Sequence, residues 1–233
     1  MGILDFFGYK SKAFEKADTT STQIQIPPKP KHMSYEDQIE VFKSLGYSFP
    51  DNITKEKILT EGVPESIKDE MRIRNLHDIE EKPFSSLYFQ LGYLNECNKC
   101  MIFDYEIMDC EDGYFTIISE MVSITEGELI LTDIICESAD EDSDQINVSF
   151  KINGIEKKWT FLLEGGLEFT LLNKLSKLPL EIGAKGKYTV FSDGEQVVVI
   201  DYMTESERDL FMQKTGLKID WLEESRYFSA PED

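Results

Sequence analysis

The chain has 233 residues, of which 41% are hydrophobic and 12% aromatic, which is enough for a packed core and excludes disorder of the whole chain. Its 45 acidic residues outnumber the 24 basic ones and leave a net charge of −21, which repels nucleic acid and anionic membranes. Since no apolar run is long enough to cross a membrane and the N-terminus lacks a secretion signal, we expect a cytoplasmic protein. We expect it to bind neither nucleic acid nor membranes.

The first part of the chain predicts an arm followed by helices. Residues 1–33 form the arm, in which a short apolar cluster leads into Pro27-Pro28-Lys29-Pro30, a sequence that favours an extended conformation. Residues 34–95 form a helical segment, because apolar residues recur at helical spacing after Ser34 and again over 84–94.

From residue 96 onward, alternation of apolar and polar residues predicts an antiparallel sheet. Asn153-Gly154 lies between two alternating runs, 146–152 and 155–163, and predicts a hairpin because both turn positions need positive φ. Asp193-Gly194 predicts a second hairpin in the same way. Three further strands are expected over 101–108, 114–124 and 128–137.

Helical spacing returns at 168–178, and Thr204-Glu205-Ser206-Glu207 is a capping box that opens a last helix ending at Gly216. This order of elements predicts the α+β class, with a largely antiparallel meandering sheet, helices packed on one face and an N-terminal helical segment. Residues 96–233 would hold the sheet with its helices, and 34–233 would form one compact domain.

The four cysteines raise the question of a metal site. Cys97-Asn98-Lys99-Cys100 has the two-residue spacing of a zinc knuckle, but Cys110 and Cys136 stand singly and supply no second pair. The residues favour four reduced thiols that pack as small apolar side chains. A redox role for the same pair has less support, because no strand precedes it and no second motif accompanies it.

Other motifs for metal binding or catalysis are incomplete. Asp140-Glu141-Asp142-Ser143-Asp144 begins like an EF-hand loop, but Gln145 replaces the turn glycine and Lys151 replaces the bidentate glutamate. The two histidines, His32 and His77, have no neighbouring nucleophile or metal-spaced partner. The sequence therefore predicts no cofactor, no metal ligand and no catalytic residue.

Most of the negative charge is concentrated in residues 96–145. This stretch holds fifteen acidic residues and one basic residue, Lys99, which accounts for −14 of the total of −21. Because evenly spread charge would serve solubility with less self-repulsion, we interpret the concentration as a surface for a basic partner. If the strands of this stretch are neighbours, their carboxylates gather on one sheet face. The predicted partner-binding residues are Asp104, Glu106, Asp109, Glu111, Asp112, Glu137, Asp140, Glu141, Asp142 and Asp144.

The C-terminal part of the chain resembles small cytoplasmic bacterial immunity proteins, which are encoded beside polymorphic toxins. The residues that carry the resemblance are Trp159-Thr160-Phe161, Leu171-Leu172-Asn173-Lys174-Leu175, Asp193-Gly194-Glu195-Gln196 and the capping box at Thr204. They follow the layout of strand, helix, hairpin and helix found in such proteins, over about a quarter of the chain. The resemblance implies a protein that binds a toxin and blocks it, with contact residues that do not carry over by position.

The sequence therefore predicts a non-enzymatic, acidic protein that occupies a basic surface of a partner protein, such as a toxin. Two alternatives remain open. One is a small carboxylate- or metal-dependent enzyme that uses Cys97 and Cys100. The other is a structural subunit that docks into an assembly through the arm at residues 1–33.

Overall fold

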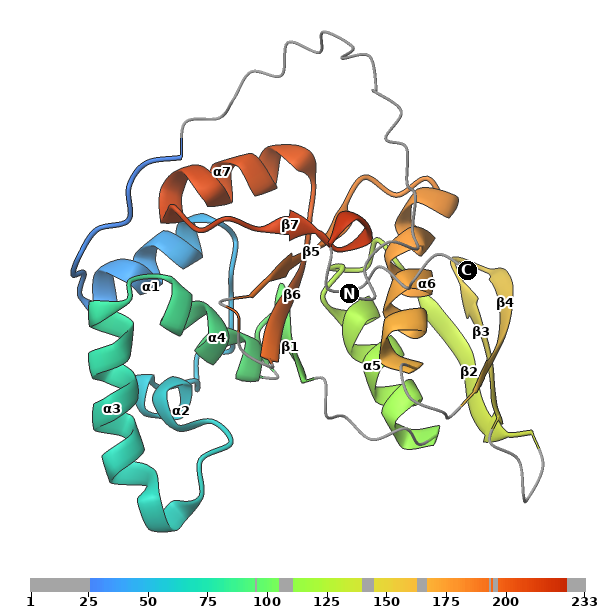
Figure 1. Ribbon diagram of the computed structural model, residues 1–233, viewed down its shortest axis with the longest axis horizontal. Coiled ribbons are helices and arrows are strands. Elements are labelled where there is room, and N and C mark those ends of the chain that lie inside the picture. Colours follow the sequence, from blue (N-terminus) through green and yellow to red (C-terminus); the bar gives the residue numbers. More distant parts are fainter. Residues whose placement is uncertain are drawn as a thin grey trace, which may run out of the picture.

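The computed structural model describes residues 26–94, 96–104, 111–139, 145–162, 167–192, 194 and 197–225, without the side chains of 111 and 167–169. Within these ranges the chain forms seven α-helices and two antiparallel β-sheets, one of four strands and one of three (Figure 1). The α+β class predicted from the sequence is confirmed.

Four helices form the N-terminal part, as the apolar spacing predicts. The first two begin at caps, because Ser34 and Thr54 each accept a hydrogen bond from the backbone N–H three residues later. Ile26 and Met33 pack against the core of these helices, so the end of the predicted arm lies on the body of the protein. The helices are α1 (Tyr35–Ser44), α2 (Lys55–Thr60), α3 (Lys68–Glu81) and α4 (Ser85–Tyr93), with a 3₁₀ turn at Glu65–Ile67.

Residues 114–124 are helical, so the prediction of a strand there is wrong. They belong to α5 (Glu111–Ser123), whose buried Tyr114, Ile117 and Met121 recur at the spacing of a helix. The aromatic and β-branched residues of this segment favour a strand locally. Burial of the apolar stripe along one helical face overrides that local preference.

Two further helices lie in the C-terminal part, α6 (Leu167–Glu181) and α7 (Glu205–Thr215). The capping box of α7 is confirmed: Thr204 Oγ1 accepts from the N–H of Glu207, and the Glu207 carboxylate accepts from the N–H of Thr204. The helix ends at Gly216, whose φ of 68° is the left-handed conformation that glycine adopts readily.

The four-stranded sheet lies at the centre of the fold. Its strand order is β1-β6-β5-β7, and every neighbouring pair is antiparallel. The hairpin predicted around Asp193-Gly194 is confirmed by the pairing of β5 with β6. The strands are β1 (Cys100–Asp104), β5 (Lys187–Phe191), β6 (Val197–Met203) and β7 (Asp220–Trp221).

Both faces of the four-stranded sheet are buried. Along β6, Val198 and Ile200 pack into a core that includes α5 and α6, whereas Val199 and Met203 pack into a second core with residues of α1–α4 and α7. A strand that is covered on both sides needs apolar residues at successive positions, and β6 has them. Helices therefore cover both faces of this sheet, where the sequence predicted helices on one face (Figure 1).

The three-stranded sheet lies beyond α5 and α6, so the strands form two sheets and not one (Figure 1). Its order is β2-β3-β4, and Asn153 and Gly154 form the predicted hairpin turn with φ values of 49° and 80°. The edge strand β2 contains a bulge, because its register shifts between Thr132 and Ile135 and Asp133 has a φ of 56°. The strands are β2 (Leu131–Ser138), β3 (Gln145–Ile152) and β4 (Ile155–Leu162).

Candidate functional site

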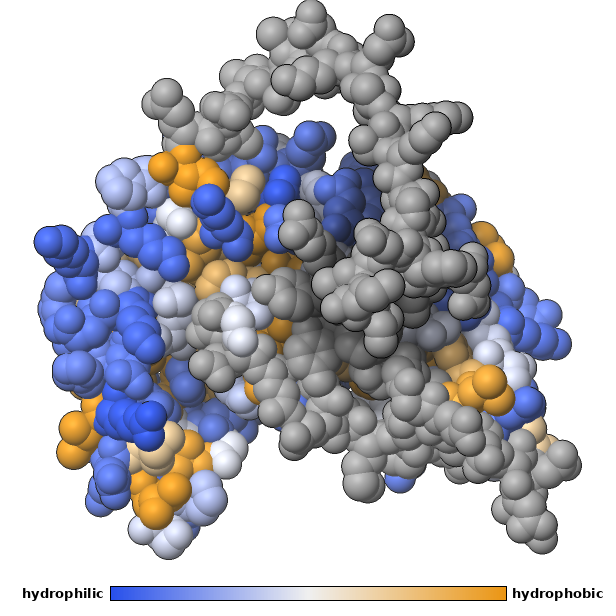
Figure 2. All heavy atoms as spheres, viewed as in Figure 1, coloured by the Kyte–Doolittle hydropathy of each residue, from blue (hydrophilic) through white to orange (hydrophobic). Residues whose placement is uncertain are grey.

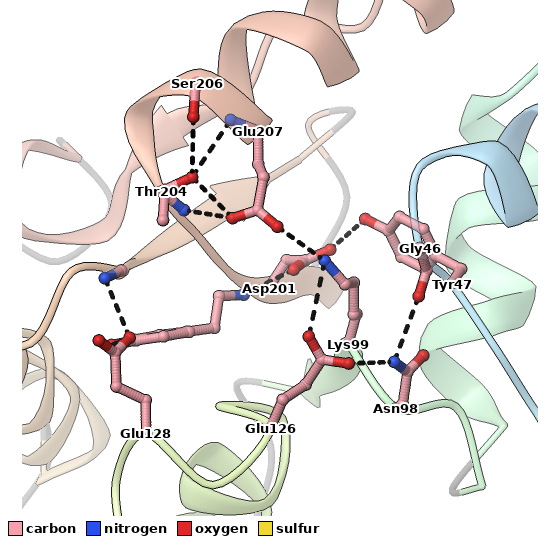
Figure 3. A network of polar contacts seen from close by, with 12 residues as sticks. Gly46, Tyr47, Asn98, Lys99, Glu126, Glu128, Asp201, Thr204, Ser206 and Glu207 are labelled. Atoms are coloured by element: carbon pink, nitrogen blue, oxygen red, sulfur yellow. Dashed lines mark hydrogen bonds and ion pairs between the residues drawn. The ribbon is translucent and has the colours of Figure 1, made fainter.

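A fully buried carboxylate, Asp201 in β6, is the centre of the candidate site. Tyr47, from the connection after α1, and Tyr88, from α4, both donate hydroxyl hydrogen bonds to its Oδ2, the second at 3.0 Å. The backbone N–H of Tyr202 donates to Oδ1 at 2.6 Å. Figure 3 shows the Tyr47 hydroxyl directed at Asp201. Three donors therefore hold this carboxyl group in one orientation.

Burial changes the acidity of this group strongly. Desolvation raises the pKa of the Asp201 carboxyl to about 7, although the tyrosine hydrogen bonds and the charge of Lys99 act in the opposite direction. The pKa values of Tyr47 and Tyr88 are raised well above the usual value, first by burial and then by the charge of Asp201. Asp201 is therefore a buried group that can gain or lose a proton near neutral pH.

Asp201 lies in a row of polar side chains across the four-stranded sheet. The strand register places it opposite Cys100 of β1 on one side and opposite Thr189 of β5 on the other. Residues directly opposite each other in an antiparallel pair project from the same face. All three are buried, and the Thr189 hydroxyl has no hydrogen-bond partner among the residues that the structure describes.

Two cysteine thiols lie at one end of this row. The Sγ atoms of Cys97 and Cys100 are 3.7 Å apart, and both residues are buried free cysteines. The hydrogen bond from Cys100, followed by the backbone N–H groups of Lys99 and Cys100, lowers the pKa of the Cys97 thiol despite its burial. Burial, followed by the contact with Cys97, raises the pKa of the Cys100 thiol well above the usual value. The two thiols are therefore chemically unequal.

A cavity of about 240 Å³ is lined in part by Cys97 and Cys100. On its other side, Thr116, Glu120 and Ser123 project from one face of α5, since they are four and three residues apart. Thr116 and Ser123 are exposed, so the lining of the cavity extends to the protein surface on α5. Desolvation raises the pKa of the Glu120 carboxyl. The remaining lining residues are Gly92, Met101, Ile102 and Ile124.

The residues between the two cysteines are fixed by polar contacts from three parts of the chain (Figure 3). The Lys99 ammonium lies 3.1 Å from a carboxylate oxygen of Glu207 in α7 and 3.8 Å from one of Glu126 in the connection after α5. The Asn98 amide donates to Glu126 at 2.6 Å and to the Gly46 carbonyl at 3.3 Å. The segment that carries the thiols is therefore held in place on several sides.

A second, more open cavity of about 490 Å³ lies beside α2 and the 3₁₀ turn. It is lined by Thr54, Glu56, Lys57, Thr60, Glu61, Gly62, Val63 and Lys68. Figure 2 shows hydrophobic and hydrophilic residues mixed at this end of the molecule. The cavity beside α5 is the better candidate for chemistry, because its lining includes Cys97, whose thiol has a lowered pKa, and Glu120, whose carboxyl has a raised pKa.

The predicted partner-binding carboxylates come from separate elements. Asp104 is partly buried at the end of β1, Asp112 is exposed in the first turn of α5, and Glu137 is exposed on β2. Because β1 pairs with β6 and β2 pairs with β3 in a different sheet, β1 and β2 do not meet the condition of being neighbouring strands. The other predicted side chains lie outside the described residues: Glu106, Asp109, Glu111, Asp140, Glu141, Asp142 and Asp144.

One feature of the sequence indicates the buried site, although Asp201 is not among the predicted functional residues. Asp201 directly follows the apolar run Val197–Ile200, and a single carboxylate within such a strand indicates a buried charge with dedicated partners. Tyr47 and Tyr88 carried no comparable signal, because tyrosines at helix ends and within helices are common core residues. Cys97 and Cys100 were identified, but the structure shows that Cys100 begins a strand.

Among the described residues, no group of three His, Cys, Asp or Glu side chains is placed to hold a metal ion. None of the described helices combines the length and apolar character needed to span a membrane. Neither a protein-family model nor a curated protein nor a solved structure matches the chain.

Proposed function

We propose that this protein is a non-enzymatic, acidic binding protein that occupies a basic surface of a partner protein, in the manner of an immunity protein that blocks a toxin. The observation that carries the proposal concerns Lys99, the one basic residue in the sequence of residues 96–145. Its side chain is 7% exposed and forms ion pairs with Glu126 and Glu207. The charge of the stretch therefore has no exposed cation of its own to balance it.

The proposed acidic surface, formed by carboxylates of residues 96–145, would act mainly on the rate of association. Carboxylates attract a cationic partner over a distance of about one Debye length and then pair with Lys or Arg side chains that otherwise bind phosphate. Exposed apolar groups beside them add the short-range contact. Phe115 is 48% exposed three residues after Asp112 on α5, and Ile135 is 53% exposed two residues before Glu137 on β2.

The experiment begins with recovery of the partner from native cells on the immobilised full chain. Association of the purified pair is then measured against salt concentration for the wild type and for the variant D140N/D142N/D144N. The wild-type association rate should fall by about tenfold or more between low and high salt, and the variant should associate more slowly at low salt.

The control variant D51N/E70Q/D220N removes three exposed carboxylates outside residues 96–145. It changes the net charge by the same amount and should associate almost as fast as the wild type. Equal slowing of the two variants would assign the effect to overall charge. An association rate that does not depend on salt would refute the electrostatic mechanism.

A further inference from the structure

We propose that Cys97 and Cys100 form a redox-active dithiol that reduces a small disulfide entering the cavity beside α5. This activity is separate from the proposed binding function. It rests on three features that lie together: two thiols in contact, a cavity whose lining includes both cysteines, and a buried carboxyl group opposite Cys100.

The geometry requires little movement for the two cysteines to join. Their sulfur atoms are 3.7 Å apart, and a disulfide bond is about 2.0 Å long. Asn98 forms hydrogen bonds with Gly46 and Glu126, and Lys99 forms ion pairs with Glu126 and Glu207. The loop that a disulfide would close is therefore already ordered. Little conformational entropy is therefore lost on oxidation.

The difference between the two thiols assigns their roles. Cys97, whose pKa is lowered, supplies the attacking thiolate, because the thiolate is the nucleophile in disulfide exchange. Its sulfur attacks one sulfur of the substrate disulfide, the substrate S–S bond breaks, and the first substrate half leaves as a thiolate. The product of this step is a mixed disulfide between Cys97 and the second half.

The second step needs Cys100 to lose its proton. Asp201 lies opposite Cys100 in the register of β1 and β6, and its carboxylate accepts that proton. The Cys100 sulfur then attacks the Cys97 sulfur and releases the second substrate half as a thiolate. Two electrons pass from the protein to the substrate, both substrate thiolates take up protons, and Cys97 and Cys100 end as a disulfide.

The cavity selects the charge of the substrate. Glu120 lies in its lining, and the protein as a whole carries −21. An anionic disulfide is repelled by both, whereas a cationic or neutral one is admitted. The volume of about 240 Å³ fits a short organic disulfide better than a folded protein. The substrate class is therefore a small disulfide without negative charge.

The test compares two probes of similar size and opposite charge, cystamine and 3,3′-dithiodipropionate. The full chain with C110S/C136S keeps only the two cysteines of the site. Folded protein should react with cystamine at least about tenfold faster than with dithiodipropionate, and faster than the same chain unfolded in urea. Buried thiols without a redox role would react more slowly when folded, and that result would overturn the proposal.

The product identifies the reaction. Trypsin cleaves after Lys99, so a disulfide between Cys97 and Cys100 would link the peptide of residues 75–99 to that of residues 100–151. In the same background, C97S should abolish the fast reaction, and C100S should accumulate the mixed disulfide on Cys97. Fast reaction of C97S, or absence of the linked peptides after cystamine treatment, would refute the assignment.

Two further variants test the surroundings. E120Q should reduce the preference for cystamine over dithiodipropionate without reducing reaction with the neutral probe 2-hydroxyethyl disulfide. D201N should slow release of the second thiol and leave the first step unchanged, which separates a proton acceptor from a merely structural residue. If D201N does not fold, the probe comparison and C97S still decide the proposal.

Discussion

Asp201 occupies a position in β6 where both neighbours along the strand, Ile200 and Tyr202, belong to a hydrophobic core. A carboxylate there is deprived of water, and its three hydrogen-bond donors replace that water only in part. Its pKa of about 7 in the folded protein lies above the usual value of 3.8. The folded state therefore binds a proton more tightly at this residue than the unfolded chain does.

This difference predicts how stability depends on pH. The contribution of Asp201 is complete below about pH 4 and is lost as the pH rises towards 7, a change on the order of 4 kcal/mol. D201N should lack this dependence. The unfolding free energy of the wild type should therefore fall relative to that of D201N as the pH rises from about 4 to 7. Urea unfolding from pH 4.5 to 8 measures it. The exposed variant D112N is the control, and a constant gap would contradict the prediction.

A glycine beside the same strand is fixed by close packing. A Cβ atom at Gly186 would lie 2.3 Å from Cε1 of the Tyr202 ring. That ring packs edge to face against Tyr188, with centroids 5.1 Å apart, and has little room to move. G186A should therefore lower the unfolding free energy by about 1–3 kcal/mol. In a Y202L background, where the ring is absent, G186A should cost much less than it costs in the wild type, as measured by denaturation of the four proteins. An equal cost in both backgrounds would show another cause.

At the scale of elements, one carboxylate joins the connection before β2 to the four-stranded sheet. Glu128 accepts hydrogen bonds from the backbone N–H groups of Lys185 and Gly186 and from the Tyr202 hydroxyl, at 2.6, 3.1 and 2.8 Å. These contacts hold the pKa of the Glu128 carboxyl below its usual range, although burial acts against them. The carboxylate thereby fixes the start of β5 against the connection between α5 and β2.

Replacing this group should be more damaging than replacing an exposed ion pair. E128Q should lower the unfolding free energy by about 1–3 kcal/mol, because an amide nitrogen would face a backbone N–H. D133N, which breaks the exposed pair with Lys151, should lose less than about 1 kcal/mol. Urea denaturation of both variants measures the difference. Equal losses would mean that Glu128 acts as an ordinary surface charge.

The sequence predicts elements best where local chemistry decides them. Asn153-Gly154 and the capping box at Thr204 are local signals, and both elements are present. Helix α5 was missed because its residues suit a strand, and only its packing decides the outcome. The buried site depends on the pairing of Cys100 with Asp201, and spacing along the chain does not predict which distant strands become neighbours.

Considered as a whole, the molecule has two cores that meet at one sheet. Phe42 lies in the core formed with α1–α4 and α7, and Leu172 lies in the core on the opposite face with α5 and α6. The strands β1, β5 and β6 contribute side chains to both cores. Loss of either core would expose one face of the shared sheet, so we expect residues 34–233 to unfold as one unit.

This expectation is testable with one substitution in each core. F42A should lower the unfolding free energy by about 3–5 kcal/mol and L172A by about 2–5 kcal/mol, since each leaves a cavity. Both should shift the same single transition when unfolding is followed by circular dichroism and by calorimetry. Two transitions, each moved by one variant alone, would show that the cores are separate folding units.

The bulge at Asp133 has a consequence for self-association. A regular edge strand presents a row of free backbone groups onto which a second chain can add, which is a common route to aggregation. In β2, the break in register between Thr132 and Ile135 interrupts that row, and Asp133 pairs with Lys151 beside it. The bulge therefore opposes extension of the ladder by a second copy, so we expect crowding in concentrated solution not to lead to polymerisation along β2.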